Sequence, residues 1–203
     1  DVYKRQAGLS QIIIDLKRDG AKVRPIKNMA GGEDFNEVVF EDVVVPKDRI
    51  VGEAGNGWAQ VTSELAYERS GPERFLSAFR VFVELVRFCG PKPTQYQATV
   101  IGRIASHIMT LRRMSISVAG MLESGKDVVV EAALVKELGN NFEKLLPELA
   151  RVVGSDGFSD FSRDGDLFRR TFEDTMLLSP SFTLRGGTRE ILRGVIARGL
   201  GLR

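Results

Sequence analysis

The sequence predicts a mainly α-helical protein, an up-down helical bundle preceded by a few β-strands. Apolar residues recur with a helical period after residue 54, whereas short apolar runs bounded by glycine and proline dominate before it. Three predicted helices of roughly 25 to 35 residues, joined by short connections, indicate antiparallel packing. We therefore expect a strand-rich segment at 7–53 and a helical bundle at 54–203.

Composition excludes several classes of protein. The 203 residues are 43% hydrophobic and 28% charged, which excludes a disordered chain. The 29 lysines and arginines against 27 acidic residues leave a net charge of +2, so we expect no nucleic-acid partner. No apolar run reaches the roughly 18 residues that predict a membrane span. The single cysteine, Cys89, excludes an intrachain disulfide and favours a reducing, cytoplasmic setting.

The same counts bear on metal binding and on the start of the chain. With one cysteine and one histidine, a zinc site built from these residues is excluded, and we expect no metal site. His107 lies within an apolar helical pattern and is interpreted as structural. Residues 1–6 resemble a vector-derived leader, which we exclude from the fold.

Four short apolar runs predict three or four strands. They occupy residues 12–14, 23–26, 38–40 and 43–45. Pro25 indicates an edge position for the second run, and Pro46 closes the fourth. So few strands cannot bury a sheet on both faces.

The first long helix is predicted from Trp58 to Val86, with a break at Pro72 and an end at 90–93. A second helix carries apolar residues from Val100 to Leu122. A turn at 124–127 follows, with Asp127 as the predicted N-cap.

The third long helix has a kink or restart predicted at Pro147. Its expected apolar stripe consists of Val130, Leu134, Leu138, Phe142, Leu145, Leu149 and Val152. A polar loop at 154–165 and two shorter helices at 166–178 and 189–200 complete the pattern. The last helix follows two glycines, Gly186 and Gly187, which allow close approach of a ligand, and has Thr188 as its predicted N-cap.

Four segments in this order resemble the C-terminal part of an acyl-CoA dehydrogenase. Residues 35–46 resemble the last strands of the family's middle β domain, and residues 51–58 resemble the start of its helical domain. Glu68 and Arg69 resemble a pair on the first long helix, and residues 187–193 resemble a Gly-Thr-Xaa-Glu-Ile signature. The resemblance implies that 7–53 is an incomplete β domain, and that this piece alone is not a competent enzyme.

The family oxidises an acyl-CoA thioester between its α and β carbons, with FAD as the electron acceptor. This chemistry needs a base near the α carbon and donors for the thioester oxygen. Much of the family places the base directly before Gly-Thr, where this chain has Gly186. A branch that includes isovaleryl-CoA and long-chain acyl-CoA dehydrogenases places a glutamate before the arginine of the first long helix. The resemblance therefore implies that Glu68 is the catalytic base.

The resemblance also implies further site residues. Arg69 and Gly186 would lie at the acyl-CoA substrate, and the segment with Gly187, Thr188 and Glu190 would lie near FAD. Backbone amides at a helix start are natural partners of anionic groups. Gly154 and Gly157 could line the dinucleotide site, although the glutamine usual in this segment is missing.

Partners follow from the same resemblance. We expect an electron-transfer flavoprotein or similar acceptor, and a homo-dimer, a homo-tetramer or a hetero-oligomer.

Without the resemblance, Glu68 would be interpreted as a solvated surface residue. Three alternatives stay open: a non-catalytic partner subunit that serves another chain's site, a helical interaction bundle without flavin, and a relative that uses oxygen or a nitroalkane.

Overall fold

The computed structural model describes residues 8–155 and 163–202, so the predicted leader at 1–6 and Gly157 lie outside the described residues. The chain forms two compact units, residues 1–65 and 66–203. No helix in the described ranges is both long enough and apolar enough to cross a membrane.

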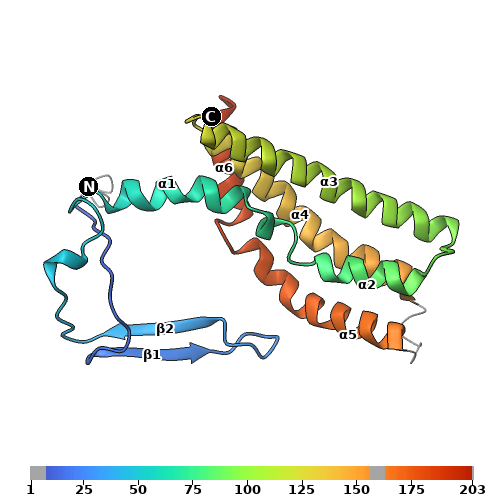
Figure 1. Ribbon diagram of the computed structural model, residues 1–203, viewed down its shortest axis with the longest axis horizontal. Helices are drawn as coiled ribbons and strands as arrows, with labels where there is room; N and C mark the ends of the chain where they lie inside the picture. The colour runs from blue at the N-terminus through green and yellow to red at the C-terminus, as the bar shows by residue number, and fades with distance from the viewer. Residues whose placement is uncertain (1–7, 156–162, 203) are drawn as a thin grey trace. The chain divides into compact units, whose positions relative to one another are not determined.

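The first unit contains a two-stranded antiparallel sheet (Figure 1). Strand β1 (Ala21–Ile26) pairs with β2 (Phe35–Phe40), with Ala21 opposite Phe40 and Ile26 opposite Phe35. The strands predicted at 23–26 and 38–40 are thus confirmed. Both strands are edges, a position that tolerates Pro25 because proline has no N–H to donate to a ladder.

The strands predicted at 12–14 and 43–45 are wrong. Ile12 forms only an isolated antiparallel bridge with Ile50. The chain leaves the sheet at Asp42, just before the run at 43–45. The Asp42 φ of 52° turns the backbone out of the extended region. The Val44 carbonyl then accepts a hydrogen bond of 2.6 Å from Arg18 Nη1, so a side chain takes the place of a neighbouring strand.

The second unit is a bundle of helices (Figure 1). It begins within α1 (Gly57–Ser70) and continues through η3 (Pro72–Arg74) and α2 (Phe79–Cys89). The long helices α3 (Gln95–Glu123) and α4 (Val129–Val153) follow, and the rest of the bundle is α5 (Arg163–Leu178), η5 (Ser179–Thr183) and α6 (Arg189–Gly199). Helix α4 contacts α2, α3, α5 and α6 and is the centre of the bundle. The mainly α-helical fold class is confirmed.

The breaks between helices follow from local chemistry. The helix predicted from Trp58 to Val86 breaks at Gly71 and Pro72, as expected, and restarts as α2 at Phe79. Helix α3 begins with a capping box, in which Thr94 Oγ1 accepts from Gln97 N at 3.2 Å and Gln97 Oε1 accepts from Thr94 N at 2.9 Å.

Two predictions about α4 need correction. The N-cap is Val128 rather than Asp127, although Asp127 Oδ1 still accepts a hydrogen bond of 3.1 Å from Val129 N. Helix α4 also continues through Pro147 to Val153, so it does not restart there. The proline lies on the buried face, where packing supports the helix around the missing N–H.

The core of the bundle is apolar and lies around α4. Its fully buried side chains include Val81, Leu85, Ile104, Val135, Leu146 and Phe168. The apolar stripe predicted for α4 is displaced, because Leu138 is 44% exposed and Val152 is 50% exposed. The face that α4 buries carries Ala132, Val135, Leu146, Ala150 and Val153, together with three polar residues, Lys136, Asn140 and Glu143.

Candidate functional site

The Glu68 carboxylate is held at one oxygen by a buried arginine. Glu68 lies near the end of α1, and the break at Gly71 and Pro72 turns the chain so that η3 returns Arg74 toward it. Arg74 Nε donates to the Glu68 carbonyl at 2.7 Å, and Arg74 Nη2 donates to Glu68 Oε1 at 2.6 Å. The Arg74 side chain is 9% exposed, whereas that of Glu68 is 41% exposed. The carboxylate is therefore fixed but accessible from solvent.

The two glycines before α6 lie against this pair. Gly186 has a φ of 68° and Gly187 a φ of 104°, in the left-handed region that favours glycine. A Cβ atom at Gly186 would lie 3.3 Å from Glu68 Oε1. Because that atom is absent, the Glu68 carboxylate faces bare backbone.

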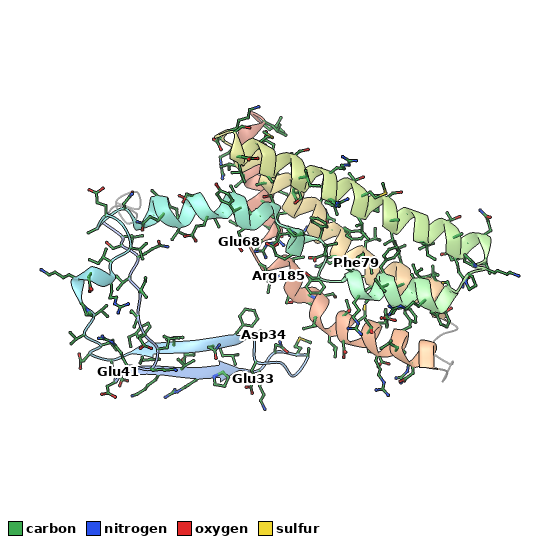
Figure 2. All side chains as sticks on the ribbon, viewed as in Figure 1. Glu33, Asp34, Glu41, Glu68, Phe79 and Arg185 are labelled. Carbon is green, nitrogen blue, oxygen red and sulfur yellow. The ribbon has the colours of Figure 1, made fainter. Side chains whose placement is uncertain are left out.

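Arg69 links α1 to the same loop. Its Nε donates to the Gly186 carbonyl at 3.0 Å, across 117 positions of sequence. Burial lowers the pKa of the Arg69 guanidinium, and the neighbouring Glu68 carboxylate opposes that shift. Arginine nevertheless keeps its charge. The structure thus brings together four residues singled out from the sequence: Glu68, Arg69, Gly186 and Gly187 (Figure 2 labels Glu68 and the adjacent Arg185).

Thr188 and Glu190 form the start of α6. Thr188 is the N-cap, as predicted, but its side chain makes no capping hydrogen bond to the helix backbone. The pKa of Glu190 lies below its usual value because its carboxylate accepts from its own backbone N–H and from the Thr188 side chain. Glu190 is exposed at the start of α6.

Gly154 lies elsewhere in the bundle. It caps the C-terminal end of α4, 18 residues beyond Lys136, or about 27 Å along a helix that rises 1.5 Å per residue. A Cβ atom there would come within 2.3 Å of the Phe168 ring. Close packing of α5 against the end of α4 therefore requires glycine at this position, and the structure does not bring Gly154 to the Glu68 cluster.

A layer of four polar residues behind the loop, three of them buried, was missed from the sequence. Its members are Lys136, Asn140 and Glu143 of α4 and Arg185 of the loop. Glu143 is fully buried; its Oε1 accepts from Ser77 N at 2.9 Å, and Arg185 Nη2 lies 3.3 Å from its Oε2. Lys136 Nζ donates to Asn140 Oδ1 and to the Phe182 carbonyl. The only available signal was the spacing of 136, 140 and 143 on one face of an apolar helix.

Two hydrogen-bond donors of this layer are not paired with any described residue. Arg185 Nε and Asn140 Nδ2 are buried and have no acceptor among residues 8–155 and 163–202. Burial lowers the pKa of Lys136 to about 8; the carboxylates of Glu143 and Glu68 oppose this shift, and Arg74 and Arg185 add to it. The cluster thus carries more cationic groups than carboxylates, which suits an anionic ligand.

A salt-bridge cluster attaches α6 to α4. Arg189 Nη2 lies 3.1 Å and Arg193 Nε 3.0 Å from Glu137 Oε1. Burial opposes ionisation of Glu137, but hydrogen bonds from both arginines outweigh it, so the pKa of Glu137 lies below its usual value. These contacts hold α6, the helix that follows Gly187, against α4.

Metal binding has no support in the part of the chain that the structure describes, where no group of three histidine, cysteine or acidic side chains could hold an ion. His107 stacks on Phe142 with ring centroids 5.6 Å apart, which is a packing role.

Comparison with known proteins identifies the family. The family model described as "Acyl-CoA dehydrogenase, C-terminal domain" matches residues 55–201. The chain belongs to the acyl-CoA dehydrogenase family. The curated acyl-CoA dehydrogenase IpdE1 of Mycolicibacterium smegmatis is 30% identical over 206 residues, covering 98% of this chain and 50% of the relative. The chain therefore spans about half the length of the curated relatives it matches.

Solved structures of the acyl-CoA dehydrogenase family share the fold. Butyryl-CoA dehydrogenase from Megasphaera elsdenii superposes with a TM-score of 0.79 at 21% identity, covering all of this chain and 54% of that one. The ChsE4–ChsE5 complex from Mycobacterium tuberculosis gives a TM-score of 0.78 at 24% identity, with 98% and 55% covered. The resemblance inferred from the sequence motifs is thus confirmed at the level of family and fold.

Proposed function

We propose that this chain supplies the proton-abstracting part of a flavin-dependent acyl-CoA dehydrogenase, with Glu68 as the base. The observation that carries the proposal is the pairing of Glu68 with a glycine at 186. The Glu68 carboxylate is partly exposed, its Oε1 is held by Arg74, and the neighbouring position has no side chain to fill the space in front of it. A base needs this combination of fixed geometry and access to the substrate.

The residues present fit a flavin and a thioester. Gly186 and Gly187 leave open a cradle that Cβ atoms would fill, and the first turn of α6 offers backbone N–H groups to an anionic group. Gly187, Thr188 and Glu190 would hold FAD, and Arg69 would position the Gly186 carbonyl beside the substrate. When bound, FAD would supply the acceptor for the hydride that leaves the β carbon of the thioester.

Within this scheme the chain's own residues handle one proton. Glu68 accepts the proton from the α carbon of the thioester, and the electron pair of that C–H bond forms the α,β double bond as hydride leaves the β carbon. The Arg74 guanidinium keeps Oε1 in place, so the other carboxylate oxygen, Oε2, takes the proton. The product is an α,β-unsaturated acyl-CoA.

Electron acceptor and assembly are part of the same proposal. We infer that an electron-transfer flavoprotein reoxidises the reduced flavin. We also infer that the protein is oligomeric, as a homo-dimer, a homo-tetramer or a hetero-oligomer. Two relatives support this: one is named as a subunit of a caffeyl-CoA reductase–Etf complex, and one solved structure is the ChsE4–ChsE5 complex. The latter also keeps a second candidate function open, that of a non-catalytic partner subunit.

Anaerobic reduction tests the proposal. The full-length, flavin-loaded protein is mixed with short-chain, branched, long-chain and steroid acyl-CoA thioesters while the flavin absorbance is followed. Bleaching with at least one thioester, accompanied by formation of the enoyl-CoA, supports the dehydrogenase. A protein that keeps its flavin oxidised with every thioester contradicts it and favours the partner subunit.

A further inference from the structure

A fully buried lysine lies directly behind the glycine that faces Glu68. Lys136 has no exposed surface. Its Cε lies 3.7 Å from the position that a Gly186 Cβ would occupy, and Glu68 Oε1 lies 3.3 Å from the same position. Lys136 of α4 and Glu68 of α1 therefore approach one glycine of the loop.

Hydrogen bonds tie Lys136 to the segment that leads to Gly186. Its Nζ donates to Asn140 Oδ1, one turn further along α4, and to the Phe182 carbonyl at 3.1 Å. Phe182 belongs to η5 and precedes Gly186 by four residues. The ammonium group thus anchors that segment to the central helix of the bundle, and Arg185, stacked 5.1 Å from the Phe182 ring, packs over the anchor.

Charged groups from each neighbouring element face Lys136. Glu143 comes from α4 itself, Glu68 from α1, Arg74 from η3 and Arg185 from the loop. Glu143 is already bonded to Ser77 N and Arg185, so it does not form a simple ion pair with the lysine. Among these groups Glu143 acts most strongly on the Lys136 ammonium group and Glu68 least, so the positive charge of Lys136 acts on both carboxylates.

We propose, resting on the function proposed above, that Lys136 is a positioning residue for Glu68. Its ammonium group holds the segment from Phe182 to Gly186 against α4, and its charge favours the ionised form of the Glu68 carboxylate. An uncharged side chain of similar length removes that charge while filling the same space.

The proposal predicts a change in pH dependence as well as in rate. A nearby positive charge favours a carboxylate, so its removal makes the carboxylate bind protons more readily. In K136M the rate of flavin reduction by acyl-CoA will therefore reach half its maximum at a higher pH than in the wild type. A purely structural role would lower the rate by the same factor at every pH.

The experiment measures flavin reduction in the full-length, flavin-loaded protein between pH 5 and pH 9. The variants are K136M, K136Q, K136R and K144M, the last removing an exposed lysine two turns further along α4. We expect the acidic half-point to rise in K136M and K136Q and to stay unchanged in K136R and K144M. Should K136M lose its flavin, K136Q provides a second neutral side chain, one that keeps an N–H donor.

The outcome separates this inference from the proposed function. If E68Q reduces its flavin slowly and the neutral Lys136 variants keep the wild-type half-point, only the role of Lys136 is overturned. If E68Q reduces its flavin as fast as the wild type, the assignment of Glu68 as base is overturned, whatever the Lys136 variants show.

Discussion

The Glu68 carboxylate depends on the missing side chain at Gly186. G186A adds a methyl group 3.3 Å from Glu68 Oε1, a distance at which the carboxylate must shift by a few tenths of an ångström. We expect flavin reduction by acyl-CoA to fall about 10-fold, because small misplacements of a reacting group are costly. The measurement is single-turnover flavin reduction beside the free energy of unfolding.

Gly125 provides the matched control for this substitution. Its φ of 70° nearly equals the 68° of Gly186, but a Cβ there would meet no atom within 4 Å. Both alanine variants should lose about 1–2 kcal/mol of stability through backbone strain. Only G186A should lose rate; equal rates in the two variants would show that Gly186 does not make room for the base.

At this scale, part of the site could be predicted from sequence. The resemblance singled out Glu68, Arg69 and Gly186, and the structure brings them together. Arg74 and Lys136 were missed because their roles depend on tertiary contacts: one returns after the break at Pro72, and the other lies on the face of α4 opposite the predicted stripe. Only the bundle shows which face of α4 is buried.

Among the elements, α6 is attached to α4 through Glu137. E137Q removes a carboxylate that serves Arg189 and Arg193, so we expect a loss of about 1–3 kcal/mol in the free energy of unfolding at neutral pH. Because the folded-state pKa of Glu137 is depressed, this stabilisation is present above the unfolded pKa and is lost as the pH falls through the folded one. Urea unfolding of wild type and E137Q between pH 3 and pH 7 measures the difference.

Glu148 is the control for Glu137 on the same helix. It pairs with Arg151 on the surface, with both side chains about half exposed, so E148Q should change stability by less than about 0.5 kcal/mol. A gap between wild type and E137Q that stays constant down to pH 3 would contradict the role assigned to the Glu137 carboxylate.

The junction of α4 and α5 depends on Gly154. G154A places a methyl group within 2.3 Å of the buried Phe168 ring, and we expect a loss of about 1–3 kcal/mol in the free energy of unfolding. G120A, in the interior of α3 with open space around it, should instead gain roughly 0.5–1 kcal/mol. Thermal unfolding of the flavin-free protein checks both. If G154A is as stable as wild type without flavin, the packing role is wrong and a role toward the cofactor gains weight.

The long helices were more predictable than the strands, for physical reasons. Helices α3 and α4 carry a helical period along their own length, and α3 also has a local start signal in the capping box at Thr94. The runs at 12–14 and 43–45 are short and β-branched, but a strand also needs a neighbour to accept its hydrogen bonds. Arg18 takes the Val44 carbonyl instead, which no local pattern foretells.

For the whole molecule, the buried Lys136 makes the free energy of unfolding depend on pH in the alkaline range. The pKa of Lys136 is lowered from 10.5 to about 8 by burial, so between these values the unfolded chain binds more protons than the folded one. Stability contributed through this group therefore rises with pH in that window and is lowest below pH 8. The free energy of unfolding of wild type relative to K136M should increase by roughly 1–3 kcal/mol between pH 8 and pH 10.5. A difference independent of pH would show that Lys136 keeps an ordinary pKa.

The central claim is that Glu68 takes the proton, and one measurement tests it most directly. The rate constant of anaerobic flavin reduction by acyl-CoA is compared in wild type, E68Q and E64Q, each with its flavin bound; Glu64 is an exposed glutamate one turn earlier on α1. We predict that E68Q is slower by about 10²–10⁴-fold, because a general base contributes that much, and that E64Q matches the wild type. Flavin reduction in E68Q at the wild-type rate would contradict the account.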